Sequence, residues 1–351
     1  MRTVGIISEY NPFHNGHKYL IETVKKELNA DCVVSVMSGN YTQRGEPAIF
    51  DMYSRAEIAC ENGVDLVLEL PPQFVLNSAQ YYAYYGIYLF HMLGHIDYLC
   101  FGSECGDIKQ LQSVGKPDGT LLKERMKTGI TYAKAVSDSP LLHEPNNILA
   151  VEYLKAMKKL KVAFQPYTIK RKAVSHDSKI TEGSFASASF LREGIKNGKD
   201  VSSFVPSLPN QAPFMEEKFL PLLNYKLICA TEENISQINN FSEGLENRFL
   251  KNRGKESIRE FIDNVKCKRY PETRIRRALY SLVLNLTKTE ELPNYTRVLS
   301  FTKTGQSFLK EIKESTSLSI YSRLSKNDFI ENHQLRKELF CNELYHLLHG
   351  K

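Results

Sequence analysis

Residues 3–17 read TVGIISEYNPFHNGH, and they contain a strand, a turn and the start of a helix. Thr3–Ile7 is rich in valine and isoleucine and is bounded by the turn at Asn11-Pro12, which predicts a buried parallel strand. From about Gly16 to Leu28, apolar residues recur at helical spacing with lysines between them, so a helix should follow. The tetrad HNGH, residues 14–17, therefore lies at the junction of a strand and a helix.

The alternation of strands and helices continues up to Gly102. Strands that alternate with helices at this spacing form a parallel sheet covered on both faces, and such sheets bind ligands at the carboxyl ends of their strands. Further strands are predicted at Cys32–Met37, Val64–Leu70 and Ile96–Phe101, and further helices at Ala48–Asn62 and Ser78–Leu93. The polar segments that follow the strands should lie along one edge of this sheet: Ser8–His17, Ser38–Pro47 and Gly102–Gly106.

The character of the chain changes after about Asp200. Val205–Pro209 has the composition of a linker, and the residues beyond it contain few strand-like runs. Helices are predicted at Glu256–Val265, Glu272–Asn285, Ser307–Lys313 and Asn332–Leu348. With 351 residues, the chain is also longer than one usual core. We therefore predict an α/β, Rossmann-like domain with a parallel sheet over residues 1–200, followed by a mainly α-helical domain over residues 201–351.

Composition excludes several classes of protein. With 42% hydrophobic, 11% aromatic and 25% charged residues, the chain resembles an ordinary globular protein. The N-terminus lacks the long apolar stretch of a signal peptide, and no run of about 18 apolar residues occurs elsewhere, so we expect a cytoplasmic protein without a membrane segment. The seven cysteines form no CxxC pair, which argues against a zinc or redox site, and we assign no metal ligands.

The tetrad has the residue types that nucleotidyl transfer requires. In a tight turn, the imidazoles of His14 and His17 and the helix N-terminal amides face one anion site, where the helix dipole favours phosphate. Gly16 leaves room for a nucleotide to approach the backbone. In-line attack at an α-phosphate needs donors aimed at its oxygens, and these two imidazoles would provide them. The alternative interpretation is a pair of surface histidines.

A second motif lies in Ala186–Arg192, at the start of a predicted helix. Ser187 is suited to cap this helix, while Ser189 and Arg192 are three residues apart and close enough in space to bind β- and γ-phosphates. The alternative is an ordinary helix cap with an arginine that faces solvent.

Together, these two motifs resemble those of the HxGH nucleotidyltransferase superfamily. Further segments then look like the successive signatures of the bacterial tRNA(Met) cytidine acetate ligase family, in that family's order and over nearly the whole chain. They are Glu9–His17, Met37–Asn40, Gln43–Ala48, Asp65–Pro71, Phe101–Glu104, Pro145–Leu149, Ile169–Arg171, Glu243–Arg248, Lys268–Tyr270 and Arg274–Arg277.

The resemblance implies an enzyme that joins acetate to ATP as acetyl-adenylate, releasing pyrophosphate. It then passes the acetyl group to N4 of the wobble cytidine of elongator tRNA(Met). Mg²⁺ is expected with the triphosphate. Besides the catalytic set His14, His17, Ser189 and Arg192, the resemblance assigns ATP contacts to Ile7, Ser8, Glu9, Tyr10, Asn11, Pro12, Phe13, His14, Asn15, Gly16, His17, Lys18, Tyr19, Leu20, Gly102, Asn146, Asn147 and Arg171.

Two other polar segments are candidates for substrate contact. The loop Ser38–Pro47 is long and polar, and its Arg44 would meet either acetate or the tRNA backbone. The alternative is an ordinary solvated connection. Lys170-Arg171 and the nearby His176-Asp177 follow a predicted strand. They have either a phosphate or RNA role, or form part of a charged surface.

A basic segment begins at Lys266 and continues through the helix predicted after it. It has too many cations to be paired by Glu272 alone, and cations around an aromatic residue suit a phosphate backbone and an unstacked base. A solvated basic face is the alternative. The resemblance favours tRNA binding by Lys268, Arg269, Arg274, Arg276 and Arg277.

Two competing functions are compatible with HxGH alone. One is a nucleotidyltransferase of cofactor metabolism, which would not need a basic helical domain. The other is a noncatalytic RNA-binding protein on this scaffold. The intact motif residues argue against it: His14, Gly16, His17, Ser189 and Arg192. No stable protein partner is predicted.

Overall fold

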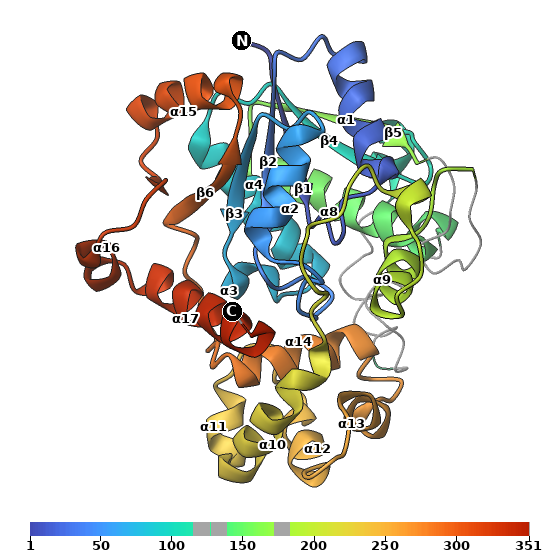
Figure 1. The fold of residues 1–351 in the computed structure, drawn as a ribbon, viewed down its shortest axis with the longest axis vertical. Helices are drawn as coiled ribbons and strands as arrows, with labels where there is room; N and C mark the ends of the chain where they lie inside the picture. The colour runs from blue at the N-terminus through green and yellow to red at the C-terminus, as the bar shows by residue number, and fades with distance from the viewer. Residues whose placement is uncertain (115–126, 128–138, 172–182, 351) are drawn as a thin grey trace.

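The structure is a computed structural model that describes residues 1–114, 127, 139–171 and 183–350. Its centre is a seven-stranded sheet in the order β5-β4-β1-β2-β3-β6-β7 (Figure 1). The strands are β1 (Thr3–Ser8), β2 (Cys32–Ser38), β3 (Leu66–Leu70), β4 (Tyr98–Ser103), β5 (Gln165–Lys170), β6 (Tyr295–Phe301) and β7 (Ser319–Tyr321). The first five are parallel, as the alternation of strands and helices predicts.

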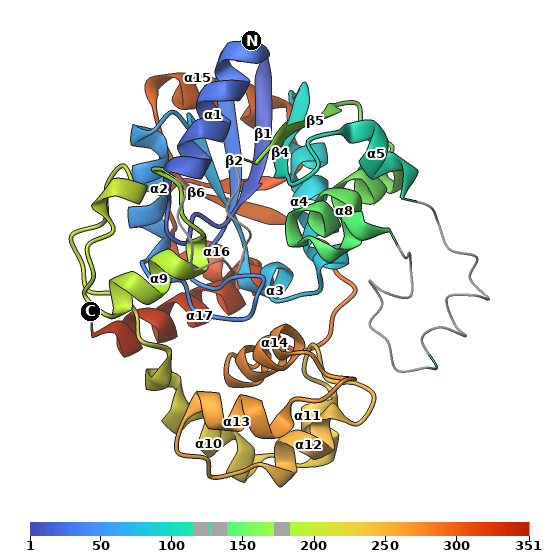
Figure 2. The same cartoon turned by 90° about the vertical axis from the view of Figure 1, so that its right-hand side faces the viewer.

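Helices cover both faces of the sheet because the strand residues are apolar on both sides. Figure 2 shows α1 and α2 on one side of β1 and β2, with α4 and α8 on the other. α15 packs with α4 and α8 in the same hydrophobic cluster. The bounds are α1 (Asn15–Glu27), α2 (Met52–Glu61), α3 (Pro72–Val75), α4 (Ala79–Leu93), α5 (Ile108–Ser113), α8 (Pro145–Leu160), α9 (Ala188–Lys196) and α15 (Lys303–Ser315).

Five helices after the Val205–Pro209 segment form a body with its own hydrophobic cluster, below the sheet in Figures 1 and 2. They are α10 (Leu220–Cys229), α11 (Glu232–Ser236), α12 (Leu245–Lys251), α13 (Ile258–Val265) and α14 (Glu272–Val283). Tyr41 and Leu76 of the sheet region, and Tyr345 near the C-terminus, belong to the same cluster. The helical body is therefore continuous with the sheet region and is not joined to it by a linker alone.

Two strands of the segment predicted as a mainly helical domain, residues 201–351, belong to the central sheet. β6 pairs antiparallel with β3, and β7 extends the sheet beyond it, although both strands lie within the segment 201–351. The physical reason is the edge of β3: all five of its residues are buried, and β6 supplies the hydrogen-bonding partner that this edge requires. The sheet is consequently mixed at this end.

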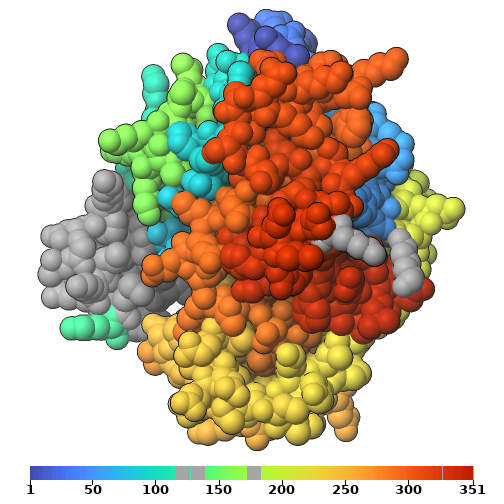
Figure 3. Space-filling view, turned by 90° about the vertical axis from the view of Figure 1, so that its left-hand side faces the viewer, coloured from blue at the N-terminus to red at the C-terminus, as the bar shows by residue number. Residues whose placement is uncertain are grey.

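The chain ends with α16 (Lys326–Glu331) and α17 (His333–His349). The space-filling view shows that the C-terminal residues cover one side of the molecule, from the sheet down to the helical body (Figure 3). Among the helices of the described residues, none has the length and apolar character needed to span a bilayer.

Candidate active site

A cavity of about 270 Å³ lies at the carboxyl ends of β1, β4 and β5, the edge where the sequence predicts ligand binding. The predicted residues that line it are Ile7, Ser8, Glu9, Tyr10, Asn11, His14, Gly16, His17, Tyr19, Leu20, Gly102, Asn146, Arg171 and Arg192. The predicted residues outside the lining are Pro12, Phe13, Asn15, Lys18, Asn147 and Ser189. The ring of Phe13 is buried, and the amide of Asn15 donates to backbone oxygens of Ser184 and Ser203.

The HNGH tetrad forms the first turn of α1, with His14 as the N-cap. Nδ1 of His14 accepts the amide hydrogen of Gly16 at 3.1 Å, and Nδ1 of His17 accepts the amide hydrogen of His14 at 3.2 Å. The two rings stack with their centroids 3.7 Å apart. A Cβ atom at position 16 would lie 2.9 Å from Cε1 of His14, so the stack requires glycine there.

These bonds fix the chemical state of both imidazoles. Because each Nδ1 accepts an amide hydrogen, the neutral ring carries its own proton on Nε2. Burial, reinforced by the neighbouring imidazole of His14 and by the charge of Arg171, holds the pKa of His17 well below its usual value. His17 is therefore a neutral hydrogen-bond donor at the cavity.

The second motif approaches the same cavity through α9. Ser187 caps this helix, because its hydroxyl accepts the amide hydrogen of Phe190 at 3.1 Å. The guanidinium of Arg192 donates to the backbone oxygen of Asn11 at 3.0 Å and to Oγ of Ser189 at 3.3 Å. The predicted pairing of Ser189 with Arg192 is present, although only Arg192 lines the cavity.

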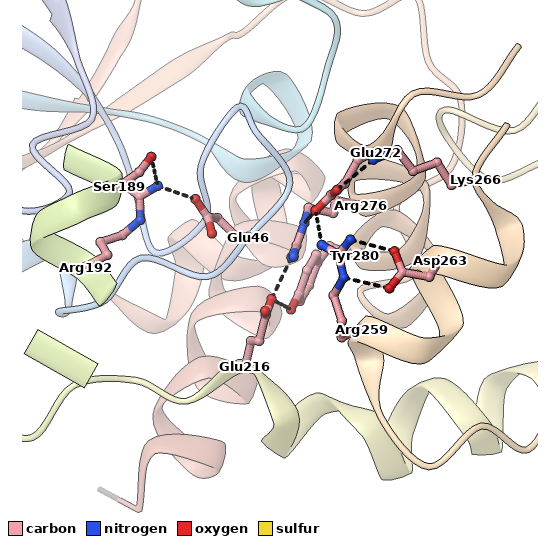
Figure 4. Close-up of polar contacts among 10 residues, drawn as sticks. All are labelled: Glu46, Ser189, Arg192, Glu216, Arg259, Asp263, Lys266, Glu272, Arg276 and Tyr280. Carbon is pink, nitrogen blue, oxygen red and sulfur yellow. Dashed lines mark hydrogen bonds and ion pairs between the residues drawn. The ribbon is translucent and has the colours of Figure 1, made fainter. Parts of the chain in front are cut away.

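Glu46 is a site residue that the sequence reasoning did not single out. Its carboxylate forms an ion pair with Arg192 at 3.1 Å, and both side chains are largely buried (Figure 4). Burial alone would raise the pKa of Glu46, but the charges of Arg192 and Arg276 lower it. No local pattern reveals this pair, because its members come from a loop and a helix far apart in the sequence.

The loop after β2 is held from two sides. Gly45 has a φ of +79°, and a Cβ atom there would lie 2.6 Å from the carbonyl carbon of Arg276 on α14. On the other side, the hydroxyl of Tyr41 donates to the backbone oxygen of Cys341 at 3.0 Å. The amide of Asn40 donates to the side chain of Asn342, also at 3.0 Å. The helical body and α17 together fix the loop that carries Gln43 and Arg44 to the cavity.

The opposite wall of the cavity comes from β4, α8 and β5. Oδ1 of Asn147 accepts the amide hydrogens of Glu104 and Cys105 at 3.0 and 3.2 Å, so this buried side chain holds the loop after β4. Asn146 lines the cavity and donates to the carboxylate of Glu104 at 2.6 Å. Burial lowers the pKa of Arg171, whose stem packs against Gly102.

The five basic residues predicted to bind tRNA fall into separate environments. Lys268 and Arg269 are exposed. Arg274 is ion-paired with Glu243 at 2.7 Å. Arg276 is paired with two carboxylates and Arg277 is buried, so neither presents an open cation.

The acidic partners include a residue that lies outside the basic segment. Arg276 contacts Glu216 at 2.8 Å and Glu272 at 3.1 Å (Figure 4). The carboxylate of Glu272 also forms ion pairs with Arg259 and Lys266. Glu272 does not pair all of the cations of the basic segment by itself, as the sequence predicted. Carboxylates from outside that segment pair two of its arginines.

Tyr270 also differs from its predicted role. Its ring is 4% exposed, its hydroxyl donates to the backbone oxygen of Glu243, and Arg274 lies 5.2 Å from its centroid. Because the ring is already covered, it is not a surface on which an unstacked base would lie.

The remaining predicted residues give a mixed result. Lys170 lines the cavity, whereas His176-Asp177 lies outside the described residues. In the part of the chain that the structure describes, no three His, Cys, Asp or Glu side chains are grouped so that they could hold a metal ion. All seven cysteines are free thiols.

Comparison with known proteins places this geometry in context. The model of a family described as HIGH Nucleotidyl Transferase matches residues 1–351. The tRNA(Met) cytidine acetate ligase of Caldanaerobacter subterraneus is 39% identical, over 99% of this chain and 95% of the relative. The ligase of the same name from Clostridium kluyveri is 37% identical over the same shares.

Solved structures agree with the sequence comparison. The crystal structure of apo Thermotoga maritima TmcAL superposes with a TM-score of 0.90 at 28% identity, covering 100% of this chain and 96% of that one. The same protein bound with alpha-thio ATP gives a TM-score of 0.87 at 29% identity, covering 100% and 95%.

Proposed function

Because the chain belongs to the HIGH nucleotidyl transferase family, and within it to the tRNA(Met) cytidine acetate ligases, we propose that it activates acetate with ATP and acetylates a tRNA. The product is N4-acetylcytidine at the wobble position of elongator tRNA(Met). The observation that carries this assignment is the single cavity shared by the HNGH turn, Arg192 and Arg171 at the carboxyl edge of the sheet.

In the first half-reaction, an oxygen of acetate attacks the α-phosphorus of ATP, and pyrophosphate leaves. His17 contributes as the neutral Nε2–H donor to the α-phosphate, where negative charge develops in the transition state. The N-terminus of α1 lies at the same site and favours that charge. Arg192 is assigned to the β- and γ-phosphates, because a guanidinium binds phosphate oxygens in a fork.

Two observations support ATP as the nucleotide. The Thermotoga relative was crystallised with alpha-thio ATP, and its fold matches this chain throughout. The cavity is bordered by the cations Lys170, Arg171 and Arg192. Mg²⁺ would arrive on the triphosphate itself, since the described residues form no metal cage and a nucleotide-borne magnesium ion needs few protein ligands.

The second half-reaction brings tRNA to the same cavity. The exposed Lys268 and Arg269, in the connection between α13 and α14, are the members of the predicted basic set best suited to contact the phosphate backbone. The helical body α10–α14 would then position the tRNA, while the sheet edge performs the chemistry.

The test is incubation of the purified protein with labelled acetate, ATP and tRNA(Met) transcript, followed by nucleoside analysis. We expect N4-acetylcytidine that depends on ATP and disappears when the wobble cytidine is replaced by uridine. Acetate-dependent exchange of pyrophosphate into ATP should proceed without tRNA. Exchange that needs no acetate, or the lack of any acetylated cytidine, would overturn the proposal.

A further inference from the structure

Transfer of the acetyl group requires a proton acceptor. The N4 amine of cytidine attacks the carbonyl carbon of acetyl-adenylate, the bond from that carbon to the phosphate oxygen breaks, and AMP leaves with the electron pair. A nitrogen–carbon bond forms, and the nitrogen must lose one proton. A side chain that takes this proton within the cavity accelerates the step.

The cavity-lining residues leave few candidates for this acceptor. Nδ1 of His17 already accepts an amide hydrogen, and the depressed pKa of this ring makes it a weak base. Nδ1 of His14 is occupied in the same way. Burial raises the pKa of Tyr10 to about 12 and raises that of Tyr82 further, so both phenols keep their protons.

The other titratable side chains of the lining are tyrosines, a lysine and arginines, and none is a carboxylic acid: Tyr19, Tyr153, Lys170, Arg44, Arg171 and Arg192. Glu9 is the single carboxylic acid among the described residues that line the cavity. A carboxylate here does not assist the binding of a triphosphate, because both are anions. The carboxylate of Glu9 therefore calls for a role beyond the ATP contact that the resemblance assigns to this residue.

The position of Glu9 is well defined. It follows the last residue of β1, and its backbone oxygen accepts a hydrogen bond from the buried Arg55. Oε1 accepts the amide hydrogen of Gln43 at 2.6 Å. Oε2 has no hydrogen-bond partner within the described part of the chain. One oxygen is thus anchored while the other is available to a substrate.

Glu9 is surrounded by charged and titratable side chains from several elements. Burial raises its pKa, and Glu46 acts in the same direction. The hydrogen bond from the amide of Gln43 opposes this effect most, followed by the charges of Arg44 from the loop and Arg192 from α9. Arg55 of α2, Tyr82 of α4 and Tyr153 of α8 complete the surroundings. A raised pKa suits a base, because it increases the proton affinity of the carboxylate.

We propose that the carboxylate of Glu9 accepts the proton from N4 of the cytidine as the acetyl group is transferred. This inference rests on the proposed function. It assigns the two half-reactions to different side chains of one cavity: His17 serves adenylation, and Glu9 serves transfer.

The test is Glu9→Gln, which keeps the side-chain volume and still offers an oxygen to the amide of Gln43. Acetyl-adenylate is formed on the enzyme first, and tRNA is then added for a single turnover over a range of pH. We expect transfer slower by about 100-fold or more, the usual range for loss of a general base, and a much smaller change in acetate-dependent pyrophosphate exchange. Wild-type transfer should rise with pH and level off, whereas the variant should lack this rise.

Two further variants keep the result interpretable. Glu9→Asp retains a carboxylate and should restore part of the transfer rate together with its pH dependence. Glu291→Gln removes an exposed carboxylate paired with His333 and should match wild type in both half-reactions. Rescue by aspartate but not by glutamine separates proton transfer from a purely structural role.

Three outcomes would overturn the inference. Transfer by Glu9→Gln at the wild-type rate means that Glu9 takes no proton. Loss of pyrophosphate exchange that is recovered by higher Mg²⁺ would make Glu9 a metal ligand. An unchanged pH profile in the slowed variant would assign the base to another group. If wild type itself forms no acetyl-adenylate, the proposed function fails, which the exchange assay shows before tRNA is added.

Discussion

The imidazole of His17 is held in one protonation state by a hydrogen bond and by burial. We predict that His17→Ala abolishes adenylation, because the lost donor acts on charge that develops in the transition state. By analogy with an oxyanion donor, the expected cost is about 3 to 4 kcal/mol, or roughly a 10²- to 10³-fold slower reaction. Acetate-dependent pyrophosphate exchange measures it. Near wild-type exchange in a variant with an unchanged melting temperature would remove His17 from the mechanism.

The lowered pKa of His17 also leads to a prediction about how the stability of the protein depends on pH. In the unfolded chain, a histidine binds a proton near pH 6.5, whereas folded His17 binds one only at a much lower pH. The unfolded state then binds more protons, so the free energy of unfolding should decrease as pH falls below about 6.5. Urea denaturation of wild type and His17→Gln at pH 7.5 and 5.5 checks this. We expect a smaller loss in the variant, and equal losses would contradict the buried neutral state.

Helix α9 carries Arg192 to the cavity, where we propose that it binds the β- and γ-phosphates of ATP. We predict that Arg192→Ala raises the ATP concentration needed for half-maximal exchange and slows pyrophosphate release, with little effect on the acetate requirement. Arg259→Ala is a matched control, because this arginine pairs with the exposed Asp263 on α13. An effect confined to acetate would move Arg192 to the other substrate.

The turn at Gly45 joins the loop after β2 to α14. Gly45→Ala should destabilise the protein in two ways, through an unfavourable positive φ and through contact with the backbone of α14. Gly254 is a suitable control, since its φ is +69° and no atom lies within 4 Å of a Cβ there. We expect Gly254→Ala to cost about 1 kcal/mol and Gly45→Ala clearly more, measured by urea denaturation. Equal costs would show that the loop does not rest tightly on α14.

Local sequence signals predicted the elements that are built from neighbouring residues. The capping role of Ser187 and the first turn of α1 follow from side chains within three residues of each other. The helix expected from Ala48 begins at Met52, because the carboxylate of Asp51 caps it. That signal was present in the sequence.

Contacts between distant segments were not predictable in the same way. β6 has an ordinary strand composition, but nothing near it indicates that its partner is β3. The ion pair of Glu46 with Arg192 likewise depends on the completed fold. Counting the charges within the basic segment overestimated the number of unpaired cations for a related reason. Glu216 and Glu243 lie outside that segment in the sequence, and they form ion pairs with Arg276 and Arg274. The candidate site was thus predictable as a location, and its electrostatic pairing was not.

We predict that tRNA binding and adenylation can be separated at the exposed cations of the helical body, Lys268 and Arg269. The double variant Lys268→Ala, Arg269→Ala should bind tRNA more weakly. A plot of log affinity against log salt concentration should be less steep, by the amount expected for the loss of about two phosphate contacts. Pyrophosphate exchange should be unchanged. The matched control replaces the exposed Lys303 and Lys310 on α15, at the end of the molecule opposite the helical body (Figure 1). An unchanged salt slope would make this surface an ordinary solvated one.

Arg277 should behave differently from these exposed cations. Its side chain is buried, burial lowers its pKa to about 10, and it faces the backbone oxygen of Gln43 beside the cavity. We predict that Arg277→Ala lowers the melting temperature and impairs pyrophosphate exchange as well as tRNA acetylation. A stable variant with normal exchange would show that the junction between the helical body and the cavity loop tolerates its loss.

The pairing of β3 with β6 also bears on how the protein is made. As the chain leaves the ribosome, β1 to β5 and the helical body emerge before Tyr295. Until β6 has been synthesised, the edge of β3 that β6 covers in the folded protein has no partner strand. Such an open edge is a template for pairing with another chain. Nascent chains are therefore vulnerable to aggregation until synthesis is nearly complete. A chain terminated before Tyr295 would retain every residue of the cavity lining. It would still lack β6, the strand that covers the edge of β3 and prevents that edge from pairing with another chain.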